Sequence, residues 1–285
     1  MSTISAKAAG TITLAGDLTV NRLGFGAMRL TGPGIWGEPR DPEGARRVLR
    51  RAMELDVDFI DTADAYGPDV SERLIGETLS PYPAGLVIAT KGGLLRDGPD
   101  QWRPDGRPEH LREALEGSLR RLRLEHIDLY QLHRPDPQVP FEESVGTLVD
   151  MQREGKIRHI GLSNVDEQQL EQGMRMTDIA SVQNRYNLAD RESERVLVRC
   201  EAAGIAFLPW FPLAVGQLAT PGGPLGAAAR EHGATPGQMA LAWLLARSPV
   251  MLPIPGTSSV EHLEQNVAAA AVKLTPDEVD TLAVA

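Results

Sequence analysis

The sequence feature that most constrains the fold is a regular alternation of short apolar runs with segments of helical periodicity. From residue 22 onward, apolar runs occur at 22–26, 59–61, 86–90, 127–132, 159–162, 179–183, 205–209 and 250–254. A segment with helical periodicity follows each of them. Short continuous apolar runs are typical of parallel strands that are buried on both faces. Eight such units in about 250 residues predict an α/β fold, a (β/α)8 TIM barrel.

Other signals support the barrel. Two short runs at 11–14 and 18–20, separated by a turn containing Gly16, predict an N-terminal β-hairpin before the barrel. Gly155 and Gly204 end two of the predicted helices. An open, doubly wound sheet is the alternative for such an alternation. No G-x-G-x-x-G motif opens a helix after the first strand, which removes the main support for that alternative.

Charge and cysteine content narrow the classes of partner and compartment. The formal net charge of −10, with no basic run, argues against nucleic acid or an anionic membrane as a partner. Cys200 is the single cysteine, so no intrachain disulfide forms, which favours the reducing cytoplasm. Residues 1–10 lack the apolar core of a signal peptide. With no linker in sight, residues 1–285 are expected to form one domain, and no obligatory protein partner is evident.

Four chemically useful side chains fall at or just after predicted strand ends. Asp61, Lys91 and His133 follow three different apolar runs, and Tyr66 lies in the loop after Asp61. A phenol with an ordinary pKa of about 10 needs a nearby cation to act as an acid, and a buried cation needs a carboxylate. Each residue alone has a simpler explanation, such as a helix cap or a solvated lysine. Together, at the carboxyl ends of barrel strands, they predict an active site.

These residues carry a resemblance to a known family. From about residue 22 to its end, the chain resembles the aldo-keto reductases, whose catalytic tetrad matches Asp61, Tyr66, Lys91 and His133. The resemblance is reinforced by GLSN at 161–164, QNRYN at 183–187 and IPGTSS at 254–259. It implies an enzyme that reduces aldehydes and ketones to alcohols by hydride transfer from a nicotinamide cofactor.

The resemblance also implies the role of each catalytic residue. Tyr66 would be the general acid in carbonyl reduction and the general base in the reverse reaction. Lys91 is expected to lower the pKa of Tyr66, and Asp61 to hold the lysine ammonium in place. His133 would donate a hydrogen bond to the carbonyl oxygen as negative charge develops on it. No metal is expected.

The cofactor site follows in the same way. Ser163, Asn164 and Gln183 would hold the nicotinamide carboxamide, and Trp210 would stack on its ring, where many relatives have tyrosine. The complete set of expected cofactor contacts is Met28, Ser163, Asn164, Gln183, Trp210, Phe211, Pro212, Leu213, Gly256, Thr257, Ser258, Ser259, His262, Gln265 and Asn266.

The adenosine end departs from the family pattern. Many relatives carry a lysine in place of Gly256, an arginine in place of His262 and a glutamate in place of Gln265. The start of the predicted helix still suits an anion, because its free N–H groups point outward. The resemblance therefore favours NADPH, with NADH as the alternative cofactor.

Loop residues are expected to choose the substrate. Trp36, Trp102 and Arg134 are candidate substrate contacts, together with Met28 and Phe211. The chain ends soon after the last predicted helix, so we expect an open pocket that accepts several small carbonyl compounds. Within the family, the segments 26–37 and 243–259 look most like bacterial pyridoxal reductases, which suggests reduction of pyridoxal to pyridoxine.

Two alternative functions remain open at this stage. The first is a cofactor-binding regulatory subunit of the same fold with little turnover, which slow reduction of simple aldehydes would support. The second is a Schiff-base enzyme that uses Lys91 as its nucleophile, which borohydride trapping of substrate would support. A strict requirement for Tyr66 and NADPH would exclude the second.

Overall fold

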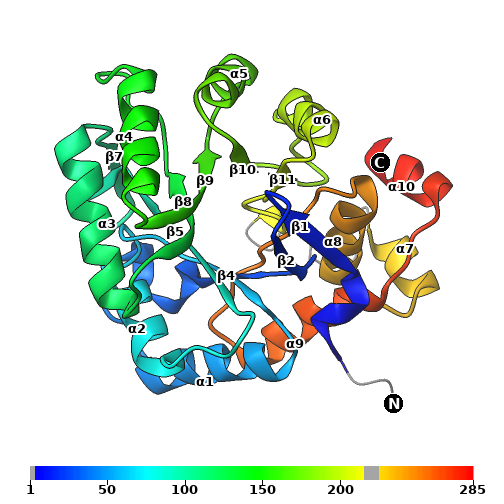
Figure 1. The fold of residues 1–285 in the computed structure, drawn as a ribbon. Coiled ribbons are helices and arrows are strands. Elements are labelled where there is room, and N and C mark those ends of the chain that lie inside the picture. The colour runs from blue at the N-terminus through cyan, green and yellow to red at the C-terminus, as the bar shows by residue number, and fades with distance from the viewer. Residues whose placement is uncertain (1–3, 215–224, 285) are drawn as a thin grey trace.

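Seven parallel strands form the central sheet. In this computed structural model, which describes residues 4–214 and 225–284, the strand order is β11-β10-β9-β8-β5-β4-β3. The strands are β3 (Phe25–Gly26), β4 (Phe59–Asp61), β5 (Val87–Gly92), β8 (Ile127–Leu132), β9 (Ile157–Ser163), β10 (Ile179–Gln183) and β11 (Ala206–Phe207). The sheet curls so that helices surround it (Figure 1). The expectation of a (β/α)8 barrel with an N-terminal hairpin is confirmed.

The eighth strand position is filled by an extended segment rather than by a regular strand. Residues 250–254 make a single parallel bridge, between Met251 and Phe207, and no strand is assigned there. On the other side the Gly24 N–H donates to the Pro253 carbonyl. Pro253 and Pro255 have no N–H to donate, so a regular ladder cannot form. The prediction of a regular strand at 250–254 is therefore wrong. The segment nevertheless takes the place of the eighth strand, because it links the two edges of the sheet.

The helices cover the outside of the sheet. In chain order they are α1 (Pro42–Glu54), α2 (Val70–Leu79), α3 (Pro108–Leu122), α4 (Phe141–Arg153), α5 (Glu167–Met176), α6 (Glu194–Ala203), α7 (Gly226–Glu231), α8 (Pro236–Arg247), α9 (Val260–Ala268) and α10 (Pro276–Val284). Successive helices lie around the rim, and α10 packs beside α8 (Figure 1). Within the two described ranges, no helix has the length and apolarity needed to cross a membrane.

The N-terminal hairpin plugs one end of the barrel. Strands β1 (Thr11–Leu14) and β2 (Leu18–Asn21) pair antiparallel, as predicted. Leu14 and Val20 of the hairpin belong to one buried cluster with Phe59, Val87 and Leu129 of the barrel strands. Phe59 and Val87 are the first residues of their strands, so the hairpin closes the amino-terminal end of the barrel. The opposite end is left for polar side chains.

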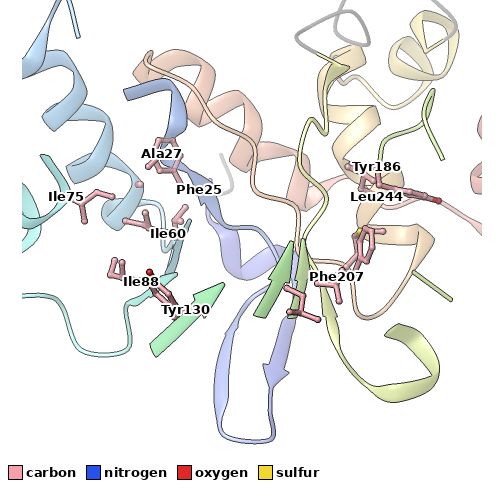
Figure 2. Packing of buried hydrophobic residues seen from close by; sticks show 14 of the residues in the cluster. Phe25, Ala27, Ile60, Ile75, Ile88, Tyr130, Tyr186, Phe207 and Leu244 are labelled. Carbon is pink, nitrogen blue, oxygen red and sulfur yellow. The ribbon is translucent and has the colours of Figure 1, made fainter. Parts of the chain in front are cut away.

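A second and larger core lies between the sheet and the helices. Ile60, Ile88 and Tyr130 point away from the barrel interior and pack with Ile75 of α2 (Figure 2). On the other side of the same view, Phe207 and Tyr186 lie near Leu244 of α8. Tyr186 stacks on Trp243 with a ring-centroid distance of 6.1 Å. Strand residues therefore alternate between the helix layer and the interior, as the period of two requires.

One element was not predicted. The stretch between Lys91 and Pro108 has the Gly, Pro and Asp content of a loop, yet it contains an antiparallel hairpin of β6 (Leu94–Gly98) and β7 (Gln101–Pro104). Its two strands are short and partly exposed, so they lack the apolar pattern that marks a barrel strand. This hairpin brings Trp102 to the site.

Candidate active site

Strand alternation decides which side chains line the open end of the barrel. In β4, Phe59 faces the interior cluster and Ile60 faces the helices, so Asp61 faces inward again. The same alternation in β5 turns Lys91 inward, two residues after Ala89. Both residues end up buried at the carboxyl ends of neighbouring parallel strands. Asp61 and Lys91 are therefore close because of the register in which β4 and β5 pair.

Lys91 is the centre of the cluster. Its Nζ lies 2.7 Å from Asp61 Oδ1, 2.7 Å from the Thr62 carbonyl oxygen and 3.2 Å from Tyr66 Oη. The side chain of Lys91 is 0% exposed and that of Asp61 is 3% exposed. The three ammonium donors therefore all have partners, and one of these partners is the phenol oxygen.

Two glutamines complete the surroundings of the carboxylate. Gln183 Nε2 donates to Asp61 Oδ2 at 2.8 Å, and Gln131 Nε2 donates to the same oxygen at 3.1 Å. With both oxygens of Asp61 engaged, the carboxylate is fixed relative to Lys91. Gln131 was not predicted as a site residue, although its position two residues before His133 on β8 is readable from strand alternation.

Two opposing effects set the pKa of Tyr66. Burial raises the pKa of Tyr66, and the Lys91 charge lowers it by less, so the net direction is upward. The prediction that Lys91 lowers the pKa of Tyr66 agrees with the direction of the lysine contribution, which burial outweighs. Burial also opposes the charge on Lys91, but Asp61 and Tyr66 raise the lysine pKa on balance. The cluster therefore holds a charged lysine beside a protonated phenol.

His133 lies on the other side of the phenol. Its ring and that of Tyr66 meet edge to face with centroids 5.8 Å apart. Burial, together with the charges of Lys91, Arg134 and Arg96, holds the pKa of His133 well below its usual value. The Nδ1 atom is buried, and no described residue hydrogen-bonds to it. A neutral imidazole at this place can donate one hydrogen bond to a bound group.

A cavity of about 1020 Å³ runs from this cluster across the open end of the barrel. Of the sequence-predicted residues, its lining includes Met28, Asp61, Tyr66, Trp102, His133, Arg134, Ser163, Asn164, Gln183, Trp210, Phe211, Pro212, Leu213, Gly256, Thr257, Ser258, His262, Gln265 and Asn266. Lys91, Trp36 and Ser259 are not part of the lining. Lys91 lies behind Tyr66. Trp36 is instead bridged to Gly67, the residue after Tyr66.

The middle of the cavity is ordered by amide hydrogen bonds. Asn164 Nδ2 donates to the His133 carbonyl oxygen and to Ser163 Oγ, each at 3.0 Å. Asn164 Oδ1 accepts from Trp210 Nε1 at 3.2 Å, which orients the indole ring. Ser163 Oγ donates to the Gln183 carbonyl oxygen at 2.9 Å. The predicted set is thus one connected network.

The far end of the cavity is built by a close backbone approach. A Cβ on Gly256 would stand 2.6 Å from the Gly26 carbonyl oxygen, so only glycine fits against β3 there. Thr257 Oγ1 accepts from the Ser259 N–H, and Ser259 Oγ caps α9 by accepting from the His262 N–H. This capping role explains why Ser259 does not line the cavity.

Several cavity residues were missed from sequence. They are Gly26, Arg29, Ile35, Leu94, Asp100, Ile254, Pro255 and the start of α8 at 235–238. For the last of these, the capping box of Thr235 and Gln238 marks in the sequence where α8 begins. Arg29 lies on a short 3-10 turn directly after β3, and its Cγ would be 3.7 Å from a Gly256 Cβ. Nothing in the local sequence marks it as a ligand.

The residues present fit a nicotinamide dinucleotide better than a metal. The cavity combines an aromatic ring, amide groups and hydroxyls with Arg29, Arg134 and His262, which suits a large, flat and anionic molecule. In the described part of the chain, no group of three or more His, Cys, Asp or Glu side chains could hold a metal ion. The barrel, the buried Tyr66–Lys91–Asp61 chain and this cavity define an NAD(P)H-dependent oxidoreductase.

The family can now be stated. The model of the aldo/keto reductase family matches residues 22–284, and the chain belongs to that family. It is 52% identical to an uncharacterized oxidoreductase of Schizosaccharomyces pombe over 97% of this chain and 90% of that protein. It is 43% identical to the pyridoxine 4-dehydrogenase of Escherichia coli, over 95% of this chain and 96% of that protein.

A solved structure supports the same conclusion. An aldo-keto reductase from Klebsiella pneumoniae in complex with NADPH superposes with a TM-score of 0.80 at 27% identity, covering 95% of this chain and 93% of that one. The sequence-based assignment to the family, and to NAD(P)H-dependent oxidoreductases, is confirmed. The family as a whole supports carbonyl reduction.

Proposed function

We propose that this protein reduces aldehydes to alcohols with NADPH and that pyridoxal, reduced to pyridoxine, is a substrate. The observation that carries the proposal is the chain of contacts from Asp61 through Lys91 to Tyr66 at the cavity wall. The relative from E. coli is named a pyridoxine 4-dehydrogenase, which supports the choice of substrate.

The reaction divides between the cofactor and the residues of this chain. NADPH, when bound, supplies the hydride that goes to the carbonyl carbon. Tyr66 gives its proton to the carbonyl oxygen; the phenol is protonated at neutral pH, since its pKa is not lowered from the ordinary value of about 10. Lys91 stabilises the phenolate that is left, and Asp61 holds Lys91 in place. The neutral imidazole of His133 donates to the oxygen as its charge grows.

The cofactor preference rests on Arg29. The 2′-phosphate that distinguishes NADPH from NADH needs a cation, and two cations common in relatives are replaced here by Gly256 and His262. Arg29 lines the same part of the cavity and forms no ion pair with any residue in 4–214 or 225–284. We therefore assign the 2′-phosphate to Arg29 with the hydroxyls of Thr257 and Ser258.

The Schiff-base alternative finds no support in the position of Lys91. Its Nζ is fully buried behind Tyr66, has three hydrogen-bond partners and does not line the cavity. A nucleophilic lysine must reach the substrate carbonyl in its neutral form. A raised pKa works against that.

Replacing Tyr66 tests the proposed function. In Tyr66→Phe the proton donor is gone, so kcat for pyridoxal reduction should fall by about 10²–10⁴-fold. NADPH should still quench the fluorescence of Trp210 with unchanged Kd. Tyr82→Phe is the matched control, because the Tyr82 hydroxyl donates to the Leu122 carbonyl outside the cavity.

Comparing the wild-type protein with Tyr66→Phe decides between the proposed enzyme and the regulatory subunit. Rapid reduction of pyridoxal that is lost only in the Tyr66 variant supports the proposal. A Tyr66→Phe protein that keeps most of its activity refutes the assignment of the acid. Tight NADPH binding without reduction of any aldehyde would instead support a regulatory subunit.

A further inference from the structure

Arg96 of β6 makes five hydrogen bonds next to the loop that carries Tyr66. Its five N–H donors match five backbone carbonyl groups. The accepting carbonyl oxygens belong to Gly34, Ile35, Ala65, Gly98 and Gln101, at distances of 2.6–3.2 Å. Every N–H group of the guanidinium therefore donates a hydrogen bond, and these bonds fix the plane of the guanidinium.

These carbonyl groups come from three separate segments. Gly34 and Ile35 lie in the loop after β3, Ala65 directly precedes the catalytic Tyr66, and Gly98 and Gln101 belong to the β6–β7 hairpin. Each of the three segments also contributes a residue to the cavity lining. Arg96 itself does not line the cavity, so it acts on the site through the groups it holds.

The guanidinium plane also supports an aromatic ring. The Arg96 Cζ lies 3.7 Å from the ring centroid of Trp102, which is close stacking. Trp102 in turn meets Tyr66 and His133 edge to face, each with a centroid distance of 6.4 Å. One side of the indole is therefore set against Arg96, while its edge contacts the two residues that handle the proton and the oxyanion.

The charge of Asp100 acts on Arg96 without forming an ion pair with it. Within residues 4–214 and 225–284, Arg96 forms no ion pair, and its partners are all neutral. The neighbouring Arg103 of β7 behaves differently, since it is half exposed and pairs with Asp97. An arginine that donates to carbonyls and lies against two indole rings, those of Trp102 and Trp36, is placed for geometry rather than for charge neutralisation.

We propose that Arg96 is a positioning residue that fixes Trp102 and the 34–35 loop against Tyr66 and thereby makes the enzyme selective for flat aromatic aldehydes. The proposal rests on the proposed reductase function. Ile35, Met28 and Trp102 form one apolar cluster with Tyr66, and all four line the cavity. An aromatic ring bound there gains from stacking or edge contact with a fixed indole, whereas a short aliphatic aldehyde gains little.

Removing the guanidinium tests this role. In Arg96→Met the indole loses its support, so KM for benzaldehyde should rise and kcat/KM should fall by about tenfold. The value for propanal should change less than twofold, and NADPH should quench tryptophan fluorescence as before. Arg103→Met is the matched control, because it removes the same charge from the same hairpin and should leave both substrates unaffected.

A double variant shows whether Arg96 acts through Trp102. If it does, Trp102→Leu alone should lose selectivity by the same factor, and the Arg96→Met/Trp102→Leu protein should be no worse. If Arg96→Met does not fold, Arg96→Lys keeps the charge but not the planar fork and should show the same loss of selectivity.

Two results would overturn the proposal. One is an equal loss for benzaldehyde and propanal in Arg96→Met, and the other is full additivity in the double variant. Either leaves the proposed function intact, because wild type and Arg103→Met would still reduce aldehydes. Failure of wild type to reduce any aldehyde would refute the function itself.

Discussion

The two ends of the cavity are built in opposite ways. At the catalytic end, Lys91 and Asp61 are almost completely buried, and their polar atoms have hydrogen-bond partners within 3.2 Å. At the far end, where we expect the adenosine half of the cofactor, Arg29 and His262 are exposed, and neither forms an ion pair with a described residue. One end is a packed network and the other is an open set of donors.

This difference predicts two kinds of response to mutation. A buried network resists partial change, because removing one member leaves its partner charged and without water. An open donor set changes in small steps, because water and neighbouring hydroxyl groups replace a lost contact. We therefore expect catalysis to fail abruptly and cofactor preference to shift gradually.

The largest effect is expected for Lys91→Met. The variant leaves Asp61 buried and uncompensated, so the protein should lose about 3–5 kcal/mol of stability. It also removes the cation beside Tyr66, and reduction should become nearly undetectable. Urea unfolding and steady-state kinetics measure the two effects. In the control Lys7→Met, which breaks an exposed pair with Asp56, both should change little. An active and stable Lys91→Met protein would contradict the comparison.

The pH profile gives the next largest effect. Because the pKa of Tyr66 is raised, the phenol stays protonated above the usual value of about 10, and kcat/KM for reduction should stay level through the neutral range. The reverse reaction needs the phenolate, so alcohol oxidation should speed up as pH rises. His133 is neutral well below the ordinary histidine pKa of about 6.5. A step in reduction near that pH would show that His133 titrates there.

A graded effect is expected for Arg29→Met. The loss of one exposed cation should weaken NADPH binding by about tenfold, because a hydrogen bond to a charged group is worth about 1.5–3 kcal/mol before water compensates. NADH binding should change less than twofold. Tryptophan fluorescence titration gives both values. Arg40→Met is the control, since Arg40 does not line the cavity. Equal weakening of both cofactors would place Arg29 elsewhere on the dinucleotide.

The smallest effect is expected for His262→Arg. This change restores a cation that many relatives carry, on an exposed face of α9, and NADPH should bind about two- to fivefold more tightly. Gly256→Lys would not be an equivalent repair, because its Cβ would meet the Gly26 carbonyl oxygen at 2.6 Å. No gain for His262→Arg in the same titration would show that Arg29 already satisfies the phosphate.

The catalytic end was largely predictable from sequence, and the reason is geometric. The period of two and the shared strand direction place Asp61, Lys91 and Gln183 at one end of the barrel, so their spacing in the sequence implies proximity. The net direction of the Tyr66 pKa was not predictable. It depends on how deeply the phenol is buried, which no local pattern reveals.

The segments around the catalytic residues were harder to predict from the sequence, and the reasons are again physical. The β6–β7 hairpin has no apolar alternation, so neither its strands nor the five carbonyl contacts of Arg96 could be read from it. Trp36 was expected to line the pocket, but it is bridged to Gly67 and is not part of the lining, whereas its neighbour Ile35 is. The regular strand predicted at 250–254 is prevented by Pro253 and Pro255.

The most direct test of the central claim is to follow deuterium from NADPH that is labelled at both C4 positions. If this protein is a carbonyl reductase with Tyr66 as the acid, one deuterium should appear on the carbinol carbon of pyridoxine in each turnover. Tyr66→Phe should bind the same NADPH and transfer almost none. Oxidation of NADPH without deuterium in the alcohol, or undiminished transfer by Tyr66→Phe, would contradict the account.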